Sequence, residues 1–307
     1  MYVTAHSRNR DAESTIARCK AVRADHVCLS VAGVSGAGET GVADAGEVRD
    51  FVGRLRDAGI ETPVAILWFG NDPKIVLDPS GDQRYIDDRR RTLDAFGQAG
   101  IGAVLHYIDL AQSSDPDDDE RYWDGLLRVF RPLVAAAEDA NVHLANHAIW
   151  RCIPEPLRSE ALAEGVTMAD YRHYAPKGWR GPYLLTDHTH IQRLIDSVPS
   201  AHNGACFCTG MHIMGGDVPA LVDVFKGRIH YSQMRDLRGR WPAAEEVFLG
   251  TGELDFADIL RRLDAAGYRG GLGPEHLGQP SRPDQDLEAE AIAFVQTKLA
   301  EVGAARV

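Results

Sequence analysis

The stretch ACFCTGMHIMGGDVPALVDVFKGRIHYSQM (residues 205–234) contains a complete strand–helix–strand unit. Its two ends, residues 205–208 and 228–234, are short apolar runs typical of buried strands. The apolar residues between them have the i, i+3, i+4, i+7 spacing of a helix with one buried face. These are Val218, Leu221, Val222 and Phe225. Gly227 ends this helix just before the second strand. Two successive strands joined by a helix form part of a parallel sheet.

The same alternation of strands and helices extends over the whole chain. Strand-like runs are found at residues 2–6, 26–31, 63–69, 103–108, 142–147, 205–208, 228–234 and 271–275. Glycines that end the preceding helices occur at Gly59, Gly100, Gly227 and Gly267. Eight such units in about 280 residues predict an α/β fold of the closed (β/α)₈ TIM-barrel type, with residues 1–307 as a single domain. A doubly wound sheet is the alternative, but the phosphate-binding turn usual after its first strand is missing.

Composition narrows the class of function. The chain has 307 residues, of which 44% are hydrophobic, enough for a sizeable core. Lys and Arg number 33 and Asp and Glu 45, so the net charge of −12 disfavours nucleic acid and anionic membranes as partners. We find no run of 18 apolar residues and no signal-like apolar core at the start. Five cysteines are an odd number, too few for a disulfide scaffold. We therefore expect a soluble cytoplasmic protein.

One connection is too long for an ordinary barrel loop. Some forty residues separate His147 from the helix expected to start near His190, and they are rich in aromatic residues and proline. This segment follows the carboxyl end of the fifth strand, the face where barrel active sites lie. We interpret residues 148–187 as a lid or insertion loop over the site. A loop for oligomer contacts is the alternative.

Ionisable and aromatic side chains recur at the carboxyl ends of the predicted strands. They are His6, Trp68, His106, His147, Cys208, His230, Glu275 and His276. A single histidine at such a place is usually structural. Four candidate metal ligands on four successive strands, namely His147, Cys208, His230 and Glu275, instead predict one bound divalent cation.

Other motifs have simpler interpretations. Cys206 lies two residues before Cys208 on the same side of the strand and is expected to be core, with a redox pair as the alternative. His188 and His190 stand where a helix begins and are expected to be capping or surface groups. The glycine-rich residues 31–41 lack the Lys-Ser/Thr of a phosphate loop and are expected to form a flexible connection.

The chain from His190 to Glu275 resembles mannonate dehydratase, a member of the xylose isomerase-like barrel superfamily. The residues that carry the resemblance are IDSVPSAHNGACFCTG (195–210), GDVPALVDVFKGRIHYSQMRD (216–236), FLGTGELDFADILRRL (248–263) and GPEHLG (273–278). The strand NVHLANHAI (141–149) looks like the family's ligand-bearing fifth strand. These pieces cover roughly the C-terminal half of the chain, whereas the N-terminal half matches only in its barrel rhythm.

The resemblance implies roles for individual residues. It makes His147 and Cys208 metal ligands, and it places Glu275 where the family has an Asp ligand. It aligns His276 with a residue implicated in proton transfer, and Arg235 with an arginine that would hold a substrate carboxylate.

Three departures from the family pattern bear on the site. Ala148-Ile149-Trp150-Arg151 replaces an acidic, proline-rich segment, the large helical insertion is absent, and Gln233 stands where the family has a histidine. Other barrels of the superfamily use a histidine three residues earlier, similar to His230. We expect His230 rather than Gln233 to be the fourth ligand.

A cation so placed would acidify a C–H bond beside a substrate carboxylate or carbonyl, and a nearby group would remove the proton. We expect a lyase (a dehydratase) that acts on a sugar acid such as mannonate through an enediolate. A sugar isomerase or epimerase, another lyase acting on a keto-sugar or modified glycoside, and an inactive binding barrel are the alternatives.

His276 and His106 are the candidate catalytic residues, and Arg235, Trp68, His6 and Trp150 are the candidate substrate-binding residues. Mn²⁺ is the metal expected from the resemblance, with Zn²⁺, Co²⁺, Fe²⁺ or Mg²⁺ also compatible. The expected partners are a small carbohydrate and further copies of the chain, as a dimer or tetramer.

Overall fold

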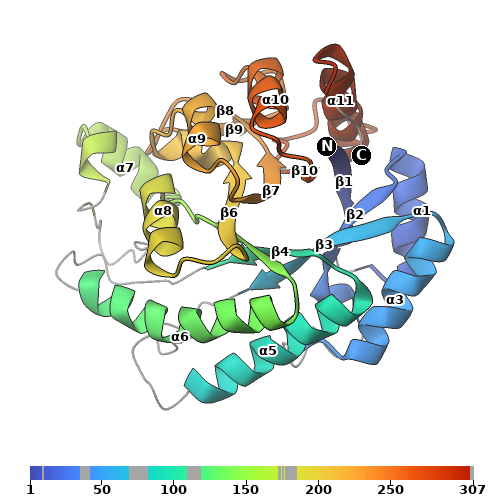
Figure 1. The fold of residues 1–307 in the computed structure, drawn as a ribbon. Coiled ribbons are helices and arrows are strands. Elements are labelled where there is room, and N and C mark those ends of the chain that lie inside the picture. Colours follow the sequence, from blue (N-terminus) through green and yellow to red (C-terminus); the bar gives the residue numbers. More distant parts are fainter. Residues whose placement is uncertain are drawn as a thin grey trace.

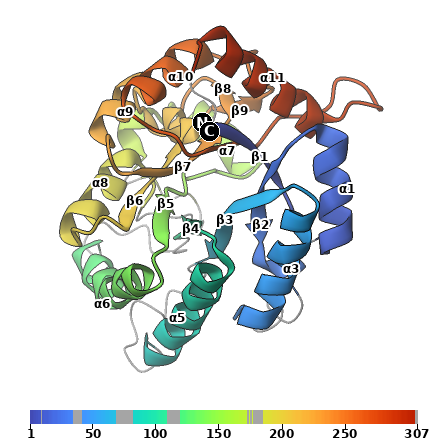
Figure 2. The same ribbon diagram turned by 45° about the vertical axis from the view of Figure 1, so that its right-hand side comes forward.

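The computed structural model describes residues 1–8, 10–34, 42–68, 82–108, 119–171, 174, 176 and 185–304. Parallel strands in these residues close into a barrel in the order β1-β10-β7-β6-β5-β4-β3-β2. The helices form a ring around this barrel (Figures 1 and 2). The predicted (β/α)₈ barrel is therefore confirmed, and the doubly wound sheet is excluded because its two edge strands would not meet.

The barrel strands differ from the predicted runs by one or two residues at their ends. They are β1 (Tyr2–His6), β2 (His26–Ser30), β3 (Glu61–Trp68), β4 (Ala103–Tyr107), β5 (His143–His147), β6 (Asn203–Cys208), β7 (Ile229–Met234) and β10 (Gly271–Pro274). β6 and β10 are buried along their whole length, and the central residues of most other strands are buried too, because helices cover the outside of the barrel.

The helices begin with strong local signals. They are α1 (Ala12–Val22), α3 (Ala45–Asp57), α5 (Asp82–Ala99), α6 (Asp119–Asp139), α7 (Leu157–Ala163), α8 (His188–Ser197), α9 (Val218–Val224), α10 (Phe256–Ala265) and α11 (Leu287–Glu301). An aspartate caps the amino end of six of them by accepting a backbone N–H: Asp11, Asp44, Asp187, Asp217, Asp255 and Asp286. The four glycines predicted to end helices all have positive φ angles, between 74° and 83°.

Asp187 caps α8 through the backbone N–H groups of Thr189 and His190. His188 and His190 therefore lie at the start of this helix, as predicted, but Asp187 is its cap and His190 is buried instead of being a surface group. The glycine-rich stretch 31–41 starts with a 3₁₀ turn, η1 (Val31–Gly33), and its residues 35–41 lie outside the described part of the chain.

Two features depart from the expected pattern. Part of the long segment after β5 is helical, since it contains α7 and the 3₁₀ turn η3 (Met168–Asp170). A small antiparallel hairpin follows β7, formed by β8 (Asp236–Arg238) and β9 (Glu245–Val247). These three-residue strands are too short to show a period in the sequence.

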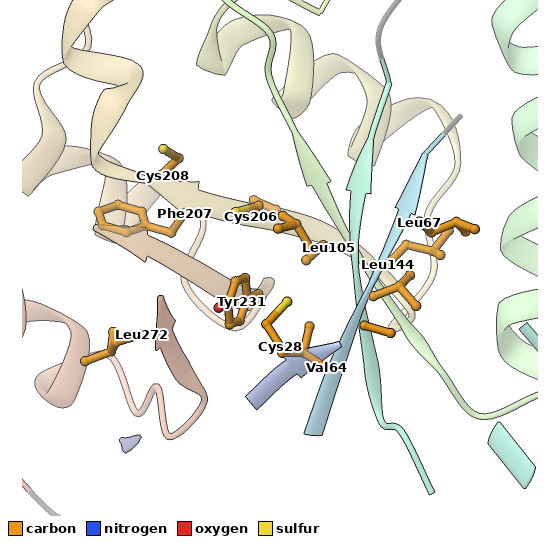
Figure 3. Packing of buried hydrophobic residues seen from close by; sticks show 14 of the residues in the cluster. Cys28, Val64, Leu67, Leu105, Leu144, Cys206, Phe207, Cys208, Tyr231 and Leu272 are labelled. Atoms are coloured by element: carbon orange, nitrogen blue, oxygen red, sulfur yellow. The ribbon is translucent and has the colours of Figure 1, made fainter. Parts of the chain in front are cut away.

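The barrel interior is filled by side chains. Tyr231 of β7 lies across it, and its hydroxyl is 2.6 Å from that of Thr4. Gly273 faces this ring, and a Cβ there would come within 2.2 Å of the Tyr231 hydroxyl oxygen. Cys206 and Cys28 lie in the same interior layer, whereas Cys208 lies further along β6 (Figure 3). Cys206 is fully buried and belongs to the core, as predicted.

None of the helices in the described ranges is both long and apolar enough to span a membrane.

Candidate functional site

Three of the predicted ligands meet at the carboxyl ends of the strands. The ligand atoms of His147, Cys208 and Glu275 all lie within 4.8 Å of one another. His147 is the last residue of β5, Cys208 is the last residue of β6, and Glu275 directly follows β10. The same end of a parallel barrel therefore supplies an imidazole, a thiol and a carboxylate to one point.

The His147 imidazole is buried but lacks a conventional partner. Neither of its ring nitrogens has a well-formed hydrogen bond among the described residues. Its ring packs 4.8 Å from that of Tyr107 and 5.2 Å from that of Trp150. Burial lowers the pKa of His147 to about 4, so the ring is neutral near pH 7. A buried neutral imidazole with free nitrogens is suited to bind a metal ion.

Glu275 is surrounded by donors. Its Oε2 accepts from Gln233 Nε2 at 2.6 Å, and its Oε1 accepts from Arg235 Nε at 3.0 Å. Burial by itself would raise the pKa of Glu275, but the charge and hydrogen bond of Arg235, together with His147 and His276, outweigh it and hold the pKa below the ordinary value. The Cys208 thiol lies 3.5 Å from Oε1, and burial raises its pKa. In the metal-free site, Glu275 is thus ionised and Cys208 is a thiol.

The hairpin after β7 adds a second carboxylate, which the sequence did not reveal. Glu246, on β9, accepts from Arg235 Nη1 at 2.6 Å. Its other oxygen lies 2.7 Å from Nδ1 of His276. Glu246 therefore joins the proposed substrate-binding arginine to the proposed proton-transfer histidine. Three-residue strands with no distinctive motif offer no signal by which Glu246 could have been found.

An open cavity of about 490 Å³ lies beside these groups. Its walls come from β1, β2, β3, β4, β7 and the connection after β10, and they include His6, Tyr107, Gln233, Glu275 and His276. This volume is within the range of small-molecule sites. The cavity lies at the mouth of the barrel, where enzymes of this architecture hold their substrates.

His230 is not among the groups at the mouth, and its prediction as fourth ligand is wrong. It is the second residue of β7, near the amino end, where its ring lies 4.5 Å from that of His143. The β6–β7 register shifts there, and beyond the shift Tyr231 pairs with Cys206 and Gln233 with Cys208. Neighbours in a parallel ladder point to the same side of the sheet. Gln233, the alternative, is therefore the residue of β7 that faces the mouth.

His106 also faces away from the cavity, so its catalytic role is not supported. Its ring stacks 6.0 Å from Phe130 of α6, and its Nδ1 lies 2.9 Å from Oδ1 of Asn146. The next residue, Tyr107, takes the interior position, and its hydroxyl accepts from Gln233 Nε2 at 2.9 Å. Strand alternation explains why Tyr107 and not His106 faces the cavity, because only one of two adjacent residues can point inward.

The other expected binding residues are placed as follows. His6 lines the cavity, and burial lowers its pKa. Trp150 packs against Arg235, whose guanidinium carbon lies 4.6 Å from the centre of the indole ring. Arg235 itself is only 3% exposed. Trp68 ends β3, and its side chain lies outside the described part of the structure.

Comparisons with known proteins place this geometry in a family. A mannonate dehydratase from Thermotoga petrophila is 28% identical over 127 residues, which is 36% of this chain and 34% of that protein. The match thus spans about a third of the relative's length. The crystal structure of mannonate dehydratase from Streptococcus suis serotype 2 superposes with a TM-score of 0.73 at 17% identity, covering 100% of this chain and 96% of the other.

A further solved structure, the IOLI protein with a bound zinc atom, has a TM-score of 0.68 at 13% identity over 98% of both chains. These two structural likenesses show a shared fold. The model of the family described as "Xylose isomerase-like TIM barrel" matches residues 32–298, which is most of the chain. The chain therefore belongs to the xylose isomerase-like TIM barrel family.

Proposed function

We propose that this protein is a divalent-metal-dependent lyase that dehydrates a sugar acid of the mannonate type. The observation that carries the proposal is the convergence of His147, Cys208 and Glu275 within 4.8 Å beside the cavity. The resemblance of about a third of the chain to mannonate dehydratases supports the substrate class.

The residues at the mouth fit a metal ion. His147 offers a neutral imidazole with free nitrogens, Glu275 offers an ionised carboxylate, and Cys208 can ionise on binding a cation. Gln233 lies beside this set, since its amide nitrogen donates to Glu275, whereas its amide oxygen accepts from Cys206. A thiolate favours softer ions, so Zn²⁺, Co²⁺ or Fe²⁺ compete with the Mn²⁺ expected from the resemblance. A bound ion would act as a Lewis acid that makes the C–H beside the substrate carboxylate more acidic.

His276 is the proposed proton acceptor. Its Nδ1 faces Glu246, so an Nδ1–H that donates to this carboxylate leaves the lone pair on Nε2. The side chain is 49% exposed and lines the cavity, so a substrate can reach it. Removal of the proton at C2 and loss of hydroxide from C3 release one water. The resulting enol converts to a 2-keto-3-deoxy acid.

The segment at residues 148–187 is the proposed lid. Its first part is anchored in the site, since Trp150 packs on both His147 and Arg235. Its later part contacts the loop between β8 and β9, because the rings of Tyr171 and Tyr174 lie 6.3 and 6.1 Å from that of Trp241. Such a cover would keep water away from the reacting carbons.

The decisive experiment combines metal analysis with a substrate screen on the purified protein. We expect about one divalent ion per chain and release of a 2-keto-3-deoxy acid from a hexonate. Cys208→Ser should lower the metal content and Cys206→Ser, its matched control in the same strand, should not. An epimerase would instead exchange solvent deuterium into a keto-sugar without loss of water. A protein that retains its metal but does neither would contradict the proposal.

A further inference from the structure

We propose that Arg8, two residues after β1, binds the carboxylate of the substrate. This inference rests on the proposed function, because it requires an anionic sugar acid in the cavity. Arg8 lines the same cavity as Glu275, His276 and Gln233.

The charges around the cavity single out Arg8. Glu275 is paired with Arg235, and Glu288 accepts from Arg18 Nε at 2.8 Å. His276 is paired with Glu246. The Arg8 guanidinium has neither a salt bridge nor a hydrogen bond to any residue in the described ranges. It is thus a cation at the cavity wall whose charge is left for a ligand.

Arg235 cannot serve the same purpose in this structure. It is almost fully buried, and its guanidinium contacts both Glu275 and Glu246. Trp150 stacks on its face, and Arg235 is not part of the cavity wall. Its donors are already directed at two carboxylates of the chain. We therefore assign Arg235 to the support of these carboxylates, and the substrate carboxylate to Arg8.

Backbone geometry supports a specialised role for this connection. Arg8 has a φ of 52° and His276 has a φ of 50°, values in the left-handed region that residues other than glycine seldom adopt. Their strands, β1 and β10, are neighbours in the barrel, so the two unusual residues follow adjacent strand ends. Residues held in such conformations concentrate at functional sites. In this case both line the proposed substrate cavity.

The chemistry fits a carboxylate. A guanidinium can donate two parallel hydrogen bonds to the two oxygens of a carboxylate, which fixes both the position and the orientation of the anion. The chain as a whole carries a charge of −12 and repels anions. A local cation at the mouth offsets this repulsion for a sugar acid and gives no such advantage to a neutral sugar.

The test measures binding by calorimetry to the metal-loaded protein. The ligands are D-mannonate and D-gluconate, with the uncharged hexitols of the same chain length as controls. We expect Arg8→Gln to weaken hexonate binding by about 10- to 100-fold, since hydrogen bonds to charged groups contribute this much. Hexitol binding should not change, and Arg8→Lys should restore part of the loss.

Arg23→Gln is the matched control. Arg23 is an exposed arginine with a φ of 57° at the end of α1, so this variant reproduces the backbone effect of the substitution away from the cavity. Unaltered hexonate affinity in Arg8→Gln would overturn the inference, as would failure of the wild-type protein to bind either hexonate. Tight hexonate binding that depends on Arg8, without any dehydration, would retain the inference and reject the proposed function.

Discussion

The two ends of this barrel both gather histidines, but the carboxyl end brings an imidazole together with a thiol and a carboxylate. At the amino end, the ring of His143 lies between those of His202 and His230, at 4.6 and 4.5 Å. At the carboxyl end, His147 lies with Cys208 and Glu275. The first cluster consists of one stacked and one tilted pair of rings, whereas in the second the ligand atoms lie close to one another.

The difference teaches what distinguishes the proposed metal centre from a group of histidines. In the described part of the chain, His147, Cys208 and Glu275 are the one set of three whose ligand atoms converge. They include a carboxylate and a thiol that can ionise to a thiolate, and these two negative charges would stabilise a cation. Three imidazoles packed against one another, with no carboxylate or thiol among them, fill space instead. The predictions below test this distinction, starting with the largest expected effect.

Replacement of one histidine from each end is the most direct test. His147→Gln should weaken metal binding by more than about 100-fold. Loss of a residue that only supports a ligand costs up to about 100-fold in metal affinity, and loss of the ligand itself should cost more. Its turnover should fall below detection together with the metal. His230→Gln should retain metal and turnover, because its ring lies at the opposite end. Metal analysis after dialysis measures both variants. Loss of metal from His230→Gln would contradict the assignment of the metal site to the carboxyl end of the barrel.

Within the mouth, a proton-transfer group can be told apart from a supporting one. His276→Gln should slow turnover by about 10²–10⁴-fold with its metal retained, because a base that touches the substrate is lost. Glu246→Gln should cost about 10–100-fold, because it removes a carboxylate that supports His276 and Arg235 but leaves the base in place. Turnover at saturating substrate and the metal content should be measured together. Rescue of His276→Gln by excess Mn²⁺ would show that His276 supports Glu275, and the base would then be sought at His6.

The smallest expected effect concerns the histidine cluster at the amino end, which should change how the free energy of unfolding depends on pH. Burial, aided by the nearby charges of His143, Arg228 and His202, lowers the pKa of His230 from 6.5 to about 3. Between these values the unfolded chain binds a proton that the folded chain does not, so the free energy of unfolding falls as the pH drops below 6.5. One such group contributes up to about 2 kcal/mol between pH 7 and pH 5.

His230→Gln removes this proton site, so its stability should decrease less over the same interval. Urea unfolding at pH 7 and pH 5 would measure the difference, with both proteins stripped of metal so that the mouth does not contribute. An identical decrease in the two proteins would mean that His230 is protonated in the folded state. It would then not be the buried neutral ring described for the amino end.

The sequence by itself determined the architecture and the end of the barrel that carries the site. Short apolar runs and helical stripes depend on local periods of 2 and 3.6 residues, which can be read without knowledge of distant partners. They located every strand of the barrel, and they placed His147, Cys208 and Glu275 at strand ends. Because all the strands are parallel, residues at equivalent ends had to meet at the same mouth.

The tertiary structure alone decided which face of a strand points inward and which distant residues complete the site. A shift of one residue in register exchanges the two faces, and the irregularity in the β6–β7 ladder pairs Gln233 with Cys208 at the mouth, while His230 lies near the amino end of β7. The same alternation replaced His106 with Tyr107. Glu246 and Arg8 reach the site from a hairpin and from the end of another strand. Such approaches depend on packing across the barrel, so no local pattern in the sequence could show them.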